Sequence, residues 1–460
     1  MATPSTATID QIYGLYLALQ MLGGIFSGAL LRLSDVCGRR GALRIMAVCV
    51  LVSLLPAALA SHFDTFLLMA LSKFLLGVST HAVASIQSTF ITECSPQAIR
   101  GAMNSVALLQ FRFGWLAGQV LAMPVLLGTN QHWPYLVLVE MGVAVVSLLL
   151  LWLFCEETPN WLMLRNRYAE AERVLRRYHG EHADIPSALK TIEDELIAQR
   201  NTVNIWQAVK SPLLNKAMLL TVMLAVANAL SGIDIIAVMS TITLAKAGFS
   251  ASAAANWSTV NVAVMTATGL ATIFLVEHCG RRPLFIVNGT VVSLLNVVCM
   301  LAVHAQHAWP QQQHNSGYVY LAAVFAFSVC FTSGSGTLTW YLPSELVPLS
   351  ARAAAQAAMC TTYMCCSVLV TATFLIAERH VGPAAFLICA VPSFVFSIVF
   401  YFLLPETKNR TIPEVDAELL RRFRVKQHGR LIERANQAEL TDSLLAETST
   451  VALVDQKQCC

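Results

Sequence analysis

The motif DVCGRR occupies residues 35–40 of the chain, and EHCGRR occupies residues 277–282. Each copy joins two long apolar segments, so each is typical of a short charged turn between two membrane-spanning helices. A charged turn that occurs twice in an otherwise apolar chain indicates a duplicated membrane domain.

Two further charged motifs recur in the same order as this turn. Glu93, followed seven residues later by Arg100, has a counterpart in Glu345, followed seven residues later by Arg352. The motif EETP after the fifth apolar segment has a counterpart in PETK after the last one. Parallel repeats of multi-helix halves are a known way to build a transporter, and the substrate site then lies between the halves.

The composition agrees with a membrane protein and argues against a soluble enzyme. Hydrophobic residues make up 56% of the chain and charged residues only 12%, whereas about 25% charged residues is usual in a soluble domain. Most of the 13 cysteines lie in apolar runs, where cysteine acts as a small hydrophobic residue. No metal-ligand spacing, nucleotide-binding loop or Ser/His/Asp arrangement is present, so we expect no metal, no cofactor, no catalytic residue and no nucleic-acid partner.

The expected architecture is an all-α membrane protein of two homologous helical bundles. A membrane-spanning helix needs about 20 apolar residues, and eleven segments meet this requirement. These segments are residues 12–32, 43–61, 65–90, 104–128, 134–154, 217–245, 257–276, 284–303, 318–342, 355–377 and 384–404. The predicted parts are an N-terminal half-bundle (1–154), a helical loop (155–216), a C-terminal half-bundle (217–404) and a tail (405–460).

Basic residues orient the chain in the membrane. Lys and Arg crowd the two DVCGRR-type turns, the 156–216 segment and the tail, and they are absent from the alternate loops at 62–64, 129–133, 248–256 and 304–317. By the positive-inside rule, the basic loops and the C-terminus are cytoplasmic and the N-terminus is external. Mixed charge at helical spacing predicts two or three short helices within 156–216, and the polar tail is expected to be largely disordered past residue 425.

In these motifs the chain resembles the major facilitator superfamily, and within it the sugar porter family that includes the facilitative glucose transporters. The similarity covers roughly residues 12–415. Its motifs are DxxGRR (35–40), ExSPxxxRG (93–101), ETPxWL (157–162), SGI (231–233), GxGxxxWxxxxEL (334–346) and PETK (405–408). The resemblance implies two half-bundles that work by alternating access. It also implies that the first span corresponds to the second helix of the family, so we expect family helices two to twelve and no counterpart of helix one.

The resemblance suggests a set of substrate-binding residues and departs from the family pattern in several of them. The candidates are Gln119, Asn228, Ser231, Asp234 and Trp340. A charge in the middle of a span normally faces a cavity or a partner, so Asp234 is interpreted as a substrate or cation contact, with a structural or proton-carrying role as the alternative. Because the paired glutamines of the family are replaced at Asn228 and Ala229, high hexose affinity is not expected.

The repeated charges suggest a second set of residues, here called the cytoplasmic gate. The gate residues are Asp35, Arg39, Arg40, Glu93, Arg100, Glu157, Glu277, Arg281, Arg282, Glu345, Arg352 and Glu406. Family resemblance implies that these groups pair when the inner side is closed and separate when it opens. A general belt of positive charge would explain the arginines, but it would not explain the matched glutamates.

Three functions follow from these patterns. The first is a facilitative carrier that moves a small polar organic solute, sugar-like by family. The second is a proton-linked or cation-selective solute transporter that uses Asp234. The third is a truncated, non-transporting paralogue that binds or regulates a full-length carrier. The expected partners are the solute and the lipid bilayer, and the expected location is the plasma membrane.

Overall fold

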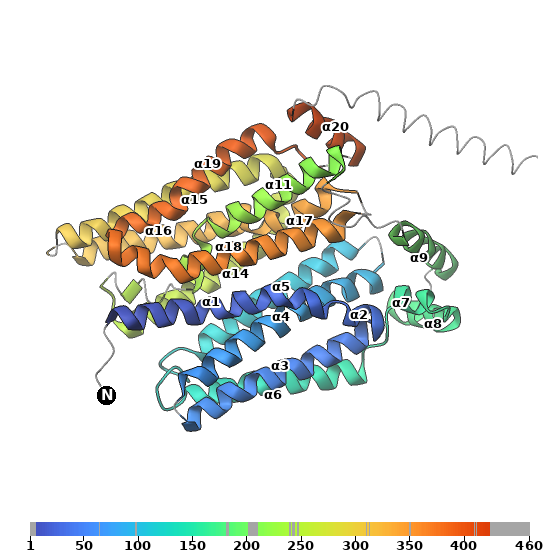
Figure 1. Cartoon of the computed structure of the whole chain (residues 1–460), viewed down its shortest axis with the longest axis horizontal. Helices are drawn as coiled ribbons and strands as arrows, with labels where there is room; N and C mark the ends of the chain where they lie inside the picture. Colours follow the sequence, from blue (N-terminus) through green and yellow to red (C-terminus); the bar gives the residue numbers. More distant parts are fainter. Residues whose placement is uncertain are drawn as a thin grey trace, which may run out of the picture.

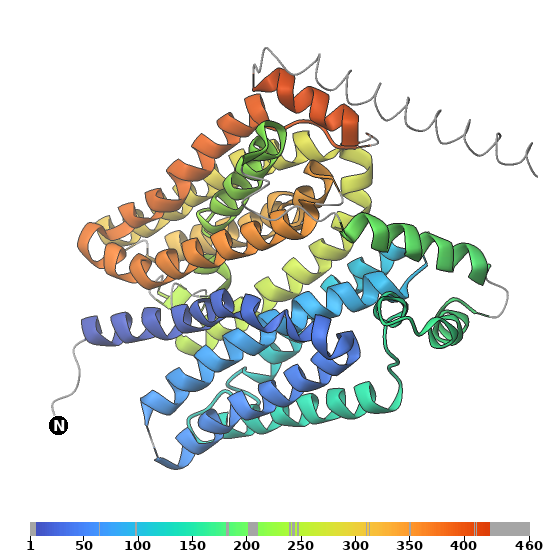
Figure 2. The same cartoon turned by 45° about the vertical axis from the view of Figure 1, so that its right-hand side comes forward.

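The chain is helical throughout the part that the computed structural model describes, and no strand occurs in that part. The described residues are 6–63, 65–96, 99–180, 184–200, 210–238, 241, 244–245, 248–309, 311, 313–348, 351–408, 410 and 412–423. The predicted all-α class is therefore confirmed. Figures 1 and 2 show two groups of long helices that lie against each other, with short helices at one end.

The first group of long helices comes from the N-terminal part of the chain. Its helices are α1 (Thr6–Leu30), α2 (Leu33–Val36), α3 (Gly38–Phe63), α4 (Phe66–Cys94), α5 (Arg100–Leu121) and α6 (Trp133–Leu153). The side chains on α6 show where this group meets lipid. Val146, Leu150 and Leu153 are at least half exposed, and an outward apolar surface of this kind is expected of a helix that faces a bilayer.

The second group comes from the C-terminal part and buries more of its side chains. Its helices are α11 (Pro212–Ala229), α12 (Ile233–Val238), α14 (Ala251–Cys279), α15 (Arg281–Ala308), α16 (Gln313–Ser333), α17 (Ser335–Leu346), α18 (Arg352–Val381), η3 (Gly382–Phe386) and α19 (Leu387–Leu403). Two large hydrophobic clusters hold these helices together, one around Phe327 and Phe374 and the other around Leu342 and Phe400.

The helices agree with the predicted spans in number but not always in continuity. Eight stretches of the described chain are long and apolar enough to cross a membrane, and one of them, Ala354–Leu403, contains both α18 and α19. Two predicted spans lie outside these stretches: α5 (22 residues) overlaps span 104–128, and α14 (29 residues) overlaps span 257–276. Each of the eleven predicted spans therefore overlaps a helix. Within two of the predicted spans, 217–245 and 318–342, the helix is interrupted: once between α11 and α12, and once at Gly334 between α16 and α17.

The break between α11 and α12 is built from local hydrogen bonds. Gly232 adopts φ +94°, a conformation that other residues rarely take. The Ser231 hydroxyl donates to the Asn228 carbonyl at 2.6 Å and accepts from the Ile233 backbone N–H at 3.3 Å. The Asn296 amide of α15 donates to the Ser231 carbonyl at 2.9 Å. Non-helical backbone at membrane depth is tolerated here because protein groups bond to it.

The two groups repeat one packing pattern and touch along two seams. In the first group α3 packs on α4 and α6, and in the second α15 packs on α16 and α19. The seams between the groups are α1 against α18 and α5 against α14. Within the described residues, the first group has no helix equivalent to α11, since α1 leads directly into the DVCGRR turn as α14 leads into its repeat.

The short helices lie at one end of the molecule (Figure 1). Between the groups run α7 (Pro159–Leu164), α8 (Tyr168–His179) and α9 (Ile185–Arg200), and α20 (Ile412–Arg422) follows α19. Helices α7–α9 share a small hydrophobic cluster that includes Leu162, Leu175 and Ile185. This confirms the prediction of two or three short helices within 156–216. The predicted disorder past residue 425 concerns residues outside the described part of the chain.

Candidate functional site

The first copy of the charged turn is held by Glu157. Gly38, at the start of α3, has φ +82°. The Glu157 Oε1 accepts from the backbone N–H groups of Arg39 at 2.7 Å and Arg40 at 3.1 Å. A carboxylate at a helix N-terminus is favoured, because the first N–H groups of a helix have no partner within it. The glycine is required by space as well as by φ, since a Cβ at residue 38 would lie 2.6 Å from Glu157 Cδ.

The second copy has the same geometry around Glu406. Gly280 also has φ +82°. The Glu406 carboxylate accepts from the backbone N–H groups of Arg281 at 3.0 Å and Arg282 at 3.2 Å. Both glutamates also accept from the next residue in the chain, Thr158 or Thr407, at 3.0 Å. The duplication inferred from the sequence therefore extends to individual hydrogen bonds.

An arginine–glutamate pair stands beside each turn. Arg39 Nε donates to Glu93 Oε1 at 3.1 Å and its Nη2 lies 3.0 Å from the same oxygen, and both side chains are buried. In the second copy, Arg281 Nη2 lies 3.5 Å from Glu345 Oε1, and Glu345 also accepts from the Thr407 hydroxyl. Asp35, which is exposed, lies 3.6 Å from Arg39 Nη1.

The remaining gate residues take varied positions. Arg282 donates from Nη2 to the Tyr401 carbonyl at 2.6 Å, and Arg352 interacts electrostatically with Glu345. The side chains of Arg100 and Glu277 lie outside the described residues. Every gate ion pair that the described residues form joins residues of the same helical group. These contacts brace each half, and their role in opening stays a prediction.

Asp234 is engaged within the second half. Its carboxylate accepts from the Ser367 hydroxyl and, at 3.3 Å, from the Tyr363 hydroxyl, both on α18. It is 4% exposed. Buried carboxylates need such partners, and the two donors stand one helical turn apart on α18. The sequence alone does not reveal this partnership, because Tyr363 and Ser367 lie far from Asp234 along the chain.

Tyr363 connects Asp234 to Trp340. The two rings meet edge to face, with centroids 5.5 Å apart, in the geometry that aromatic pairs prefer. In the part of the chain that the structure describes, the Nδ2 of Asn228, buried at the end of α11, has no hydrogen-bond partner. Asn261 on α14 is 1% exposed, and neither of its side-chain polar atoms has a partner there. Both amides therefore keep unsatisfied hydrogen-bonding atoms, which are uncommon in a protein interior.

The structure brings together only some of the predicted substrate-binding residues. Trp340 and Asp234 share Tyr363 as a neighbour, and Ser231 shapes the helix break beside Asn228. Gln119 lies on α5, across the α5–α14 seam, and among the described residues no hydrogen bond joins it to this group. The sequence analysis did not assign Tyr363, Ser367 or Asn261 to the site. The signal that the sequence offers for Asn261 is a polar residue inside an apolar span, 257–276.

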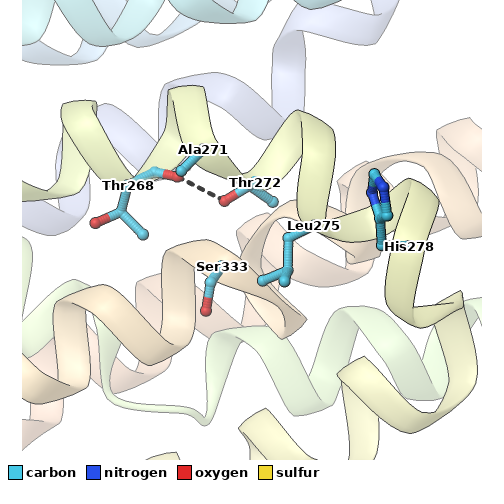
Figure 3. Close-up of a pocket in the computed structure, with 6 residues that line it drawn as sticks. All are labelled: Thr268, Ala271, Thr272, Leu275, His278 and Ser333. Atoms are coloured by element: carbon cyan, nitrogen blue, oxygen red, sulfur yellow. Dashed lines mark hydrogen bonds between the residues drawn. The ribbon is translucent and has the colours of Figure 1, made fainter.

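A pocket of about 290 Å³ opens beside α14 (Figure 3). It is lined by Thr268, Ala271, Thr272, Leu275, His278 and Ser333. Its wall is mainly apolar, and the Thr272 hydroxyl is already bonded to the carbonyls of Thr268 at 2.8 Å and Thr332 at 3.2 Å. The pocket therefore offers few free polar groups to a solute. Within the described residues, no cluster of three His, Cys, Asp or Glu side chains could hold a metal ion.

Known proteins resemble this chain in sequence and in fold. The family model described as "Sugar (and other) transporter" matches residues 2–419. The solute carrier family 2 facilitated glucose transporter member 2 of Gallus gallus is 28% identical over 427 residues, which cover 91% of this chain and 78% of that protein. Member 4 of Mus musculus is 27% identical over 419 residues, covering 90% and 81%.

Solved structures show the same fold. The partially occluded inward open conformation of the xylose transporter XylE from E. coli matches with a TM-score of 0.75 at 21% identity, covering 89% of this chain and 91% of that one. The proton:xylose symporter XylE bound to 6-bromo-6-deoxy-D-glucose matches with a TM-score of 0.70 at 21% identity, covering 91% of each chain.

Proposed function

The chain belongs to the sugar transporter family, and we propose that it is an integral membrane carrier that moves a small, sugar-like polar solute by alternating access. The observation that carries this proposal is the pair of internally braced halves. In each copy a half-buried glutamate that follows the half, Glu157 or Glu406, ties the charged turn of that half, and among the described residues the main contacts between the halves lie along two seams, α1–α18 and α5–α14. Two rigid bodies with narrow seams can rock against each other around a site between them.

The proposed halves are residues 1–154 and 217–404, with 155–216 and 405–460 on the cytoplasmic side of the plasma membrane. The substrate site combines Gln119 from the first half with Asn228, Ser231, Asp234 and Trp340 from the second. The unpartnered amide of Asn228 supports this assignment, because a buried polar group without a partner loses about 1–3 kcal/mol that a bound solute could restore.

The test is uptake into vesicles that contain only the purified protein. We expect labelled pentoses or hexoses to enter faster than in protein-free vesicles, and unlabelled solute on the far side to accelerate exchange. Monodisperse, correctly oriented protein that exchanges none of the solutes offered would support the non-transporting alternative instead.

We propose that transport is facilitative, since Asp234 is held by two hydroxyls inside one half. The proton-linked alternative makes a different prediction for Asp234→Asn, which removes the titrating group but keeps a hydrogen-bond acceptor. For a facilitative carrier the wild type and this variant share one pH profile between pH 5 and pH 8. A wild-type pH dependence that disappears in the variant would establish proton coupling through Asp234.

A further inference from the structure

Arg112 places a permanent positive charge deep within the first half. It lies twelve residues after Arg100, where α5 begins, so it stands about 18 Å along the helix at 1.5 Å per residue. An arginine at this depth of a bilayer is costly unless it faces a cavity or a partner of opposite charge.

The Arg112 side chain crosses the seam between the halves. A Cβ at Gly269 of α14 would lie 2.9 Å from Arg112 Nε and 3.0 Å from its Cδ. The guanidinium group thus lies across a residue of the second half, where the absence of a side chain makes room for it. Tyr341 of α17, also in the second half, is close enough to interact with Arg112 electrostatically.

No protein carboxylate neutralises this charge within the described part of the chain. None of the ion pairs formed by the described residues includes Arg112. Asp234 is engaged by Ser367 and Tyr363, and Glu345 by Arg281 and Thr407. A neutral sugar would leave the guanidinium without a counter-charge, whereas a solute that brings its own carboxylate would supply one.

A second polar group on α5 stands on the same face as Arg112. Gln119 follows seven residues later, which is about two helical turns, so the two side chains project to one side. Arg112 can bind a carboxylate through two parallel N–H donors, and Gln119, farther along the same face, can bond to hydroxyls.

We propose that the solute is anionic, a polyhydroxylated monocarboxylate of the sugar-acid class, whose carboxylate binds Arg112 at the α5–α14 seam. This inference rests on the proposed carrier function and specifies its substrate class. A small inorganic anion such as chloride would also neutralise the Arg112 guanidinium group. The experiment distinguishes a sugar-acid carboxylate from an inorganic anion as the counter-charge.

The experiment compares the uptake of labelled D-glucuronate and D-glucose by reconstituted full-length protein. The variants are Arg112→Gln, Arg112→Lys and, as a matched control, Arg173→Gln on the exposed face of α8. We expect glucuronate uptake to fall by roughly 10- to 100-fold in Arg112→Gln, the range that follows from losing a charge-assisted hydrogen bond. The lysine variant should retain part of the glucuronate uptake, and the control all of it.

Ligand-induced stabilisation of the purified protein gives a readout that does not need transport, because a ligand that binds only the folded state raises the unfolding temperature. If glucuronate stabilises the wild type but not Arg112→Gln while no solute crosses the vesicles, the anion site stands and the carrier function fails. Equal glucuronate uptake and stabilisation in both proteins overturns the proposal, and so does a wild type that takes up glucose but neither binds nor moves glucuronate. Glucose uptake that requires chloride, and loses this requirement in Arg112→Gln, also overturns it, because the counter-charge is then inorganic.

Discussion

Alanine at the two equivalent glycines should destabilise the protein unequally. Gly38 and Gly280 share φ +82°, and alanine at a sparsely populated conformation of this kind costs about 1–3 kcal/mol. The surroundings differ, however. A Cβ at residue 280 would lie 3.4 Å from Glu406 Cδ, whereas a Cβ at residue 38 would lie only 2.6 Å from Glu157 Cδ.

The closer contact at residue 38 requires Glu157 to retract from the N-terminus of α3. Retraction breaks at least one of its charge-assisted hydrogen bonds to the backbone, and such a bond contributes about 1.5–3 kcal/mol. The expected total is therefore about 2.5–6 kcal/mol for Gly38→Ala and about 1–3 kcal/mol for Gly280→Ala. The side chain of aspartate is one methylene shorter and leaves room for the Cβ at residue 38. Glu157→Asp combined with Gly38→Ala should therefore recover part of the lost stability.

Thermal unfolding of the purified proteins in one detergent, followed by intrinsic fluorescence, measures this ranking. The expected order of unfolding temperature is wild type, then Gly280→Ala, then Gly38→Ala, with the double variant above Gly38→Ala. Equal unfolding temperatures for the two glycine variants would refute the steric argument, because backbone strain alone predicts the same loss of stability in both.

Three further outcomes follow from the structure. Arg39→Ala leaves the buried carboxylate of Glu93 unpaired and should cost about 3–5 kcal/mol in the same unfolding assay; Arg39→Ala with Glu93→Gln should be less destabilised than the single variant, and an additive loss would show that the pair is not coupled. Burial raises the pKa of Asp416 on α20 to about 6, so the folded state holds this proton more tightly than the unfolded state and stability falls as pH rises from about 4 through about 6. Hydrogen exchange of α20 should follow that trend in the wild type but not in Asp416→Asn, and identical pH trends would remove Asp416 as the cause. A tag at the N-terminus should bind antibody on intact cells and a tag at the C-terminus only after permeabilisation; the reverse pattern would invert the predicted topology.

Local patterns predicted most of the helical architecture. Apolar length located the spans, and the recurrence of charge located both turns and their glutamates, because a duplicated sequence conserves the local backbone geometry that it encodes. Charge matching also indicated that arginines of the turns pair with the repeated glutamates, and the structure assigned Arg39 to Glu93 and Arg281 to Glu345. The two helix breaks were missed, because Ser231–Gly232 and Gly334 lie inside runs that remain apolar on both sides.

The sequence by itself determined the duplication, the membrane-spanning class and the family of this protein. These properties reside in composition and in motifs that are continuous along the chain. Only the tertiary structure decided that Asp234 bonds to Ser367 and Tyr363, and that Arg112 lies across Gly269 in the other half. Such contacts depend on which faces of distant helices meet, and hydropathy fixes the length of a membrane helix but not its rotation about its own axis.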